Sequence, residues 1–86
     1  MFVVELALTD DPRRLAARPA HRELLARLRD EGLVMMAGPF ADDSEAIVIL
    51  DLPDVAAVER FLADDAYYTT PGVTVVRKVE WAPVIH

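Results

Sequence analysis

The order of the apolar segments along this chain restricts its fold more than any other feature does. Apolar residues recur at every second position in a half-buried strand, and at every third or fourth position in an amphipathic helix. This criterion predicts strands and helices in the order β-α-β-β-α-β. The strands are expected at residues 2–8, 33–40, 46–52 and 73–81, and the helices from Pro19 to Gly32 and from Pro53-Asp54 to Asp64-Asp65.

Local signals support these boundaries. Pro19 suits the first turn of the first helix, where a missing N–H has no partner to lose, and Gly32 suits its left-handed end. The five residues between the second and third strands favour a hairpin. The predicted fold is therefore α+β and ferredoxin-like, with a four-stranded antiparallel sheet. In the strand expected at residues 73–81, alternation predicts one face that is formed by Val73, Val75, Val79 and Trp81 and is interrupted by Arg77.

The chain is too short to hide all of its apolar surface. Its 86 residues predict a single domain, residues 1–86, and a domain of this size buries only about 60–65% of its unfolded surface. There is no cysteine to form a disulfide, and 53% of the residues are hydrophobic. Both helices are expected on one sheet face, yet residues 33–37 and 46–50 carry apolar groups toward both faces. We therefore expect a homodimer joined through its sheets, with a cleft at the seam, because residues 82–86 are too few to cover the open face.

Composition excludes several classes of partner. The net charge of −6 argues against nucleic acid, and the local arginines are interleaved with acids as on a solvated helix face. No apolar run reaches the roughly 20 residues that span a membrane, and the first ten residues lack the basic start of a signal peptide. We expect a cytoplasmic protein. The arginines that are interleaved with acidic residues are Arg13, Arg14, Arg18, Arg22, Arg27 and Arg29.

The sequence offers no evident metal or cofactor site. The only histidines are His21 and His86, and no thiolate is available, so a structural zinc site is not expected. There is neither a glycine-rich phosphate loop nor a nucleophile elbow. We expect no cofactor and no metal.

His21 and Asp65 are the candidates for chemistry. His21 precedes Leu25 by four residues on the inward side of the first helix, and a partly desolvated, neutral imidazole can act as a general base. Asp64 and Asp65 both lie at a helix C-terminus, where negative charge is unfavourable, so one of them is expected to serve elsewhere by orienting a histidine. The alternatives stay open: a histidine bonded to backbone at a helix start, and a solvent-exposed helix end.

Three further residues could line a binding site. Gly38 ends the second strand and allows backbone to approach closely, Ser44 in the hairpin could donate a hydrogen bond, and Tyr67 beside Tyr68 could form a pocket wall. A turn-ending serine and ordinary rim packing of the tyrosines are the alternatives.

Three short segments stand in a recognisable order along the chain: Arg18-Pro19-Ala20-His21 with the helix that follows it, Ala37-Gly38-Pro39, and Asp64-Asp65-Ala66-Tyr67 with Gly72. Taken together, they resemble the YciI-like (YCII-related) family of the dimeric α+β barrel group. The resemblance implies a ferredoxin-like fold, a dimer whose sheets form a barrel, and an active-site dyad of His21 and Asp65. It also implies that Arg18 contacts an anionic substrate group. Ala66 departs from the family pattern, which has proline there.

The resemblance further implies a small-molecule enzyme without a cofactor. One family member is a dehydrochlorinase of a chlorinated hydroxyhydroquinone, and related barrels include muconolactone isomerases. We therefore expect a lyase or isomerase that moves a proton on a small anionic cyclic or aromatic compound. The alternatives are a non-catalytic small-molecule binding or accessory module and a structural dimerisation domain.

Overall fold

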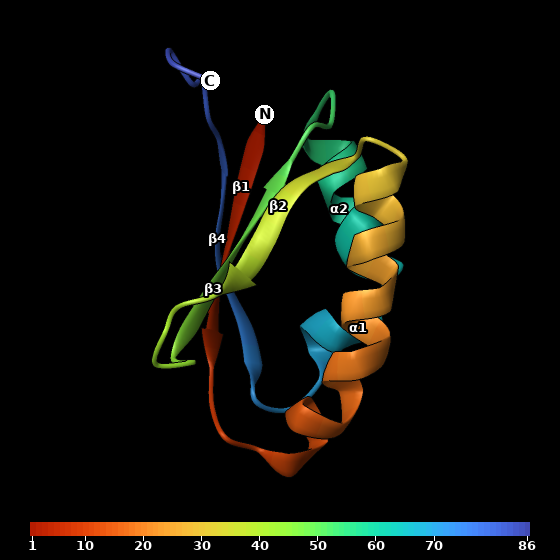
Figure 1. Cartoon of the computed structure of the whole chain (residues 1–86), viewed down its shortest axis with the longest axis vertical. Helices are drawn as coiled ribbons and strands as arrows, with labels where there is room; N and C mark the ends of the chain where they lie inside the picture. The colour runs from red at the N-terminus through yellow and green to blue at the C-terminus, as the bar shows by residue number, and fades with distance from the viewer.

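The computed structural model describes all 86 residues and has the expected order of elements (Figure 1). One short 3₁₀ helix, η1, was not expected from the sequence. The elements are β1 (Phe2–Leu8), α1 (Pro12–Asp30), β2 (Val34–Pro39), β3 (Glu45–Leu50), α2 (Val55–Ala63), η1 (Ala66–Thr69) and β4 (Val73–Glu80).

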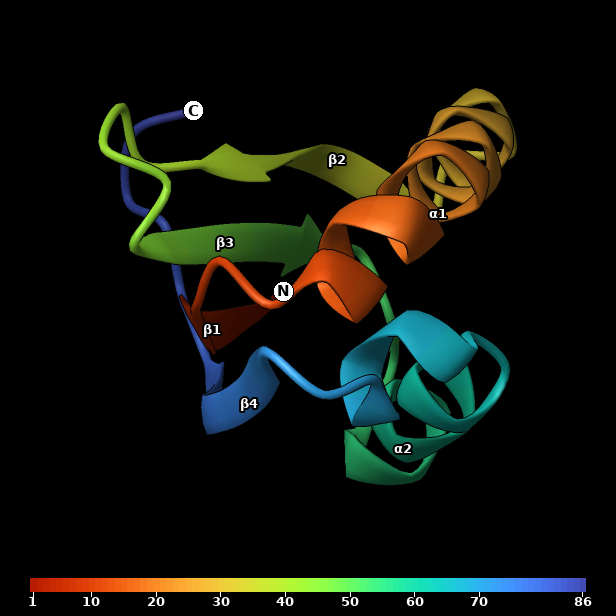
Figure 2. The same cartoon turned by 90° about the horizontal axis from the view of Figure 1, so that it is seen from below.

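The four strands form one antiparallel sheet in the order β2-β3-β1-β4. Both helices lie on the same side of this sheet, as Figure 2 shows in a view along the layers. The predicted α+β, ferredoxin-like fold is confirmed. Neither helix combines the length and the apolar character that crossing a membrane requires.

The core fills the space between the sheet and its helices. Val4 and Leu6 of β1 and Val48 and Leu50 of β3 are almost completely buried, because alternate side chains of each strand point to the same side. Val58 of α2 closes the core from above. The central pair of strands therefore carries most of the apolar packing.

The first helix begins seven residues earlier than expected, so the placement of Pro19 in its first turn is wrong. The side chain of Asp11 caps the helix by accepting a hydrogen bond from the Arg13 N–H, and Pro12 occupies the first helical position. Pro19 lies inside α1, where it removes the N–H that would bond the Leu15 carbonyl. His21 consequently lies more than two turns from the N-terminus of α1, and the helix dipole does not act on it.

The expected alternation of β4 is also wrong, because a bulge divides the strand. Leu6 pairs with Val75 but Glu5 pairs with Arg77, so Val76 is the extra residue. Val75 therefore faces the helices, whereas Val79 lies on the opposite face.

The face of the sheet that no helix covers is largely apolar. It presents a shallow depression of about 370 Å³, and a Glu5–Arg77 ion pair lies within it. The C-terminal segment does not cover this face, because Val84 and Ile85 are 93% and 91% exposed. We name it the open face, and its apolar residues are Val3, Ile47, Ile49, Val79 and Trp81.

Candidate functional site

A cavity of about 580 Å³ lies between α1 and the helix-covered side of the sheet. It is lined by residues from β1, α1, β2, β3 and η1 of one chain, with its walls mostly apolar and its charged side chains supplied chiefly by α1. The sequence analysis placed the cleft at the seam between two copies. The structure instead forms it within a single chain, on the side of the sheet opposite the open face.

His21 and Asp65 meet beside this cavity. The Nδ1 atom of His21 lies 2.6 Å from Oδ2 of Asp65, although the two residues are 44 positions apart in sequence. Both side chains are largely buried, with 8% and 11% of their surfaces exposed. A carboxylate can only accept a hydrogen bond, so Nδ1 of His21 carries a proton in this pair.

Asp65 is itself held in place by the start of η1. Its Oδ1 atom accepts a hydrogen bond of 2.9 Å from the Tyr67 N–H, as an N-cap residue does. Both carboxylate oxygens are thus engaged, one by backbone and one by imidazole. This arrangement fixes the carboxylate at the start of η1, next to Ala66.

Two tyrosines fix the imidazole plane. The Tyr67 ring stacks on His21 with a centroid distance of 3.9 Å and an interplanar angle of 8°, and the Tyr68 ring meets it edge-on at 5.3 Å. Burial, and next the charge of Asp65, raise the pKa of Tyr68, whose hydroxyl is buried without a hydrogen-bond partner. Tyr68 therefore stays neutral and acts through its ring.

The second nitrogen of His21 is free. Nε2 forms no hydrogen bond within the chain, and it does not belong to the fully buried polar atoms that lack a partner. His21 lines the cavity whereas Asp65 does not. In the neutral ring, Nε2 therefore presents an accessible lone pair on the cavity side, with Asp65 behind it.

A buried arginine, Arg14, lies in α1 seven residues before His21. Arg14 has no exposed surface; its Nε donates to the Thr9 carbonyl at 2.6 Å and its Nη2 donates to Asp43 at 2.8 Å. The neighbouring Tyr67 hydroxyl, and after it Asp43, raise the pKa of Arg14 against the opposing effect of burial. Its remaining nitrogen, Nη1, is buried with no hydrogen-bond partner of regular geometry.

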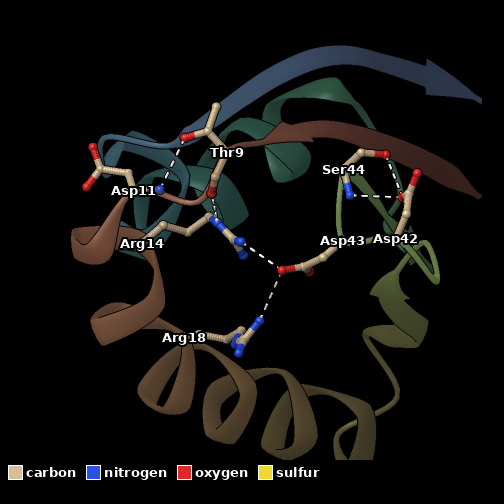
Figure 3. A network of polar contacts seen from close by, with 7 residues as sticks. All are labelled: Thr9, Asp11, Arg14, Arg18, Asp42, Asp43 and Ser44. Atoms are coloured by element: carbon tan, nitrogen blue, oxygen red, sulfur yellow. Dashed lines mark hydrogen bonds and ion pairs between the residues drawn. The ribbon is translucent and has the colours of Figure 1, made fainter.

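Arg18 and Asp43 complete a charged end of the cavity. Arg18 shares the same carboxylate oxygen of Asp43 at 3.5 Å, and Figure 3 shows Asp43 reaching from the β2–β3 loop toward both arginines. The hydrogen bond from Arg14, and the charges of Arg14, Arg18 and Arg22, lower the pKa of Asp43. Four arginines and a single acid line the cavity, so its surroundings are positive in a chain whose net charge is −6.

The other expected binding residues differ in position. Tyr67 and Gly38 line the cavity. A side chain at Gly38 would meet nothing within 4 Å, so no close backbone approach requires glycine there. Ser44 lies outside the cavity lining, and its hydroxyl donates to Asp42 at 2.6 Å within the same loop.

Sequence analysis missed Arg14 and Asp43. It assigned Arg14 to a solvated helix face, yet the residue is fully buried. The signal was present, because Arg14 and Arg18 lie seven and three residues before His21 and so continue its inward stripe toward the N-terminus. No such pattern marks Asp43, which adopts a left-handed conformation with φ of 60° in an irregular loop.

No group of three or more histidine, cysteine or acidic side chains is placed to hold a metal ion.

Comparison with known proteins identifies the family of this chain. No curated protein sequence matches the chain. The model of the YCII-related domain matches residues 1–82, nearly the whole length, and the chain therefore belongs to the YCII-related family.

Proposed function

We propose that this protein is a cofactor-free lyase or isomerase that moves a proton on a small anionic cyclic or aromatic compound. The observation that carries the proposal is the His21–Asp65 pair, in which Nδ1 is held by the carboxylate and Nε2 is left accessible at a cavity. An oriented imidazole of this kind is the usual general base of enzymes that act near neutral pH.

The reaction follows from the state of the ring. Nε2 of His21 takes a proton from an activated carbon or a phenol of the substrate, and the electron pair left behind passes into the conjugated system. In an isomerase the imidazolium returns the proton to another carbon of the substrate. In a dehydrochlorinase the electron pair expels chloride. In both cases Asp65 stabilises the imidazolium that forms.

The shape and charge of the cavity support the substrate class. A volume of about 580 Å³ lies in the range of small-molecule sites, and its apolar walls suit a ring. Arg14 and Arg18 at one end provide attraction for an anionic substituent. The Tyr67 face beside His21 keeps the imidazole rigid while a planar substrate approaches.

Proton exchange tests the proposal before the natural substrate is known. A panel of cyclic and aromatic carboxylates and chlorinated dihydroxy aromatics is incubated with the protein in deuterated water, with deuterium incorporation followed by NMR and chloride release measured in parallel. We expect at least one compound to exchange or react, and the His21→Ala variant to lose that activity while keeping its circular dichroism spectrum.

The matched control is His86→Ala, which removes the other histidine at the exposed C-terminus and should change nothing. Undiminished turnover in His21→Ala would remove this residue from the mechanism. A non-catalytic binding module is the rival function, favoured by the rigid aromatic enclosure of His21, which also suits a recognition site. It predicts saturable binding of a panel compound with neither exchange nor product.

We also propose that two copies associate through the open face, as in a dimeric α+β barrel. Three features support a second copy as the occupant. The face is apolar, its one ion pair of Glu5 and Arg77 is already neutralised within the chain, and the C-terminal segment leaves it uncovered. Light scattering at micromolar concentration tests this, and a compact monomer would refute it.

A further inference from the structure

The buried guanidinium of Arg14 is incompletely satisfied. Nε and Nη2 each have a partner, whereas Nη1 is enclosed with no hydrogen bond of regular geometry, although the Tyr67 hydroxyl lies near the guanidinium. A buried donor without a partner is unfavourable, and more so when it belongs to a charged group. Arginine is best satisfied by a carboxylate that accepts two parallel hydrogen bonds.

The group that now faces Arg14 is a poor substitute for such a carboxylate. Asp43 accepts from Arg14 through Oδ2 alone, the same atom contacts Arg18 at a long 3.5 Å, and Oδ1 has no partner. Asp43 also adopts φ of 60°, in the left-handed region that residues other than glycine, asparagine and aspartate seldom occupy.

Asp43 also belongs to a part of the chain that lies outside the buried core. It belongs to the loop of residues 40–44, in which the other four residues are exposed. Its own N–H bonds the Phe40 carbonyl inside the same loop. Displacing Asp43 therefore moves no side chain of the buried core, although the end of the loop is held to β1 by the hydrogen bond from the Leu8 N–H to the Ser44 carbonyl.

We propose that Asp43 is an internal anion that occupies a carboxylate-binding subsite formed by Arg14 and Arg18, and that the ligand's own carboxylate displaces it. With Asp43 in place Arg14 has no exposed surface, so no ligand can reach it. With Asp43 withdrawn, a ligand carboxylate bonds both Nη1 and Nη2 of Arg14. The exchange replaces one negative charge by another, so the buried cation is never left unpaired.

The inference rests on the proposed function for the identity of the cavity, and it defines the ligand as a small carboxylate. The Tyr67 ring stacks on His21, while its hydroxyl lies beside Arg14 and raises that residue's pKa. The two sites are thus separated by about one tyrosine side chain. A carboxylate anchored at Arg14 therefore leaves the adjoining ring of the same molecule near Nε2 of His21.

Benzoate and its neutral analogue benzamide test the subsite by calorimetric titration. If Asp43 occupies the subsite nine-tenths of the time, Asp43→Asn raises the apparent affinity for benzoate about tenfold. The control is Asp42→Asn, which makes the same change of charge one residue away, where the carboxylate bonds only Ser44. It should leave the affinity unchanged, and benzamide should bind weakly to every variant.

A structural function of Asp43 predicts the opposite, namely that Asp43→Asn weakens benzoate binding or leaves it unaltered. Either result, an equal rise in Asp42→Asn, or equal binding of benzamide would overturn the proposal. If Asp43→Asn does not fold, NMR of the unmodified protein decides. Saturating benzoate should shift the side-chain carboxyl carbon of Asp43 and the Nε–H of Arg14, and the absence of these shifts refutes displacement. Proton exchange by the His21→Ala variant tests the proposed function separately.

Discussion

The two adjacent carboxylates at the end of α2 allow the contribution of the His21–Asp65 pair to be measured without a substrate. Asp65 engages His21 and caps η1, whereas the side chain of Asp64 is exposed and forms no hydrogen bond. We expect Asp65→Ala to destabilise the protein strongly. Asp64→Ala should be neutral or slightly stabilising, because it removes a negative charge from a helix C-terminus.

The magnitude follows from the two hydrogen bonds that Asp65→Ala removes. A bond from a charged carboxylate to a largely buried partner is worth about 1.5–3 kcal/mol, and loss of an N-cap side chain costs about 1 kcal/mol. The free energy of unfolding should therefore fall by about 2.5–4 kcal/mol, out of the roughly 4–13 kcal/mol typical of 86 residues. The corresponding decrease in Tm is about 10–30 °C.

Urea unfolding followed by circular dichroism, at one fixed protein concentration, measures these differences. Asp65→Asn refines the comparison, because an amide oxygen can still cap η1 but lacks the charge that faces His21, so its loss should be intermediate. Equal midpoints for Asp65→Ala and Asp64→Ala would show that the carboxylate does not hold His21 in solution.

Three other perturbations test separate parts of the structure. Gly72→Ala should destabilise by about 2 kcal/mol in urea unfolding, since φ is 99° and the new Cβ would lie 2.8 Å from the Cβ of Asp11, whereas Gly38→Ala should be neutral. Asp43 has a pKa below its usual 3.8, so its stabilising effect is complete above that value and is lost as the pH falls through the lowered pKa. The difference in stability between the unmodified protein and Asp43→Asn should therefore vanish in acid. Ile49→Lys on the open face should yield monomers in sedimentation, and an unchanged mass would contradict association through that face.

Regular elements were predictable because apolar spacing reports burial directly. β1 has the expected bounds, and β2, β3 and β4 differ from the expected bounds by one or two residues. The start of α1 was missed because Pro19 was placed in the first turn, although Asp11-Pro12, an acidic cap followed by proline, is also a helix start. The β4 bulge could not be predicted, since it depends on how β4 pairs with β1 rather than on its own residues.

The candidate site was likewise predictable only in part. The meeting of His21 and Asp65 was expected from the family resemblance and from the unfavourable position of Asp65, and the structure brings them to 2.6 Å. The burial of Arg14 depends on η1 and the β2–β3 loop folding against α1, which are contacts between distant segments. From composition alone, Arg14 was predicted to lie on an exposed, charged helix face.

The alternation of side chains along β3 has a consequence for how this protein can change over time. Val48 faces the core beside the cavity, whereas the next residue, Ile49, lies on the open face, and only Ile47 contributes to both surfaces. Successive residues of β3 therefore contribute to two different surfaces on opposite sides of the same strand. A substitution at Ile49 can alter what the molecule associates with, and one at Val48 can reshape what it binds, so relatives can diversify in one property while the other is inherited intact.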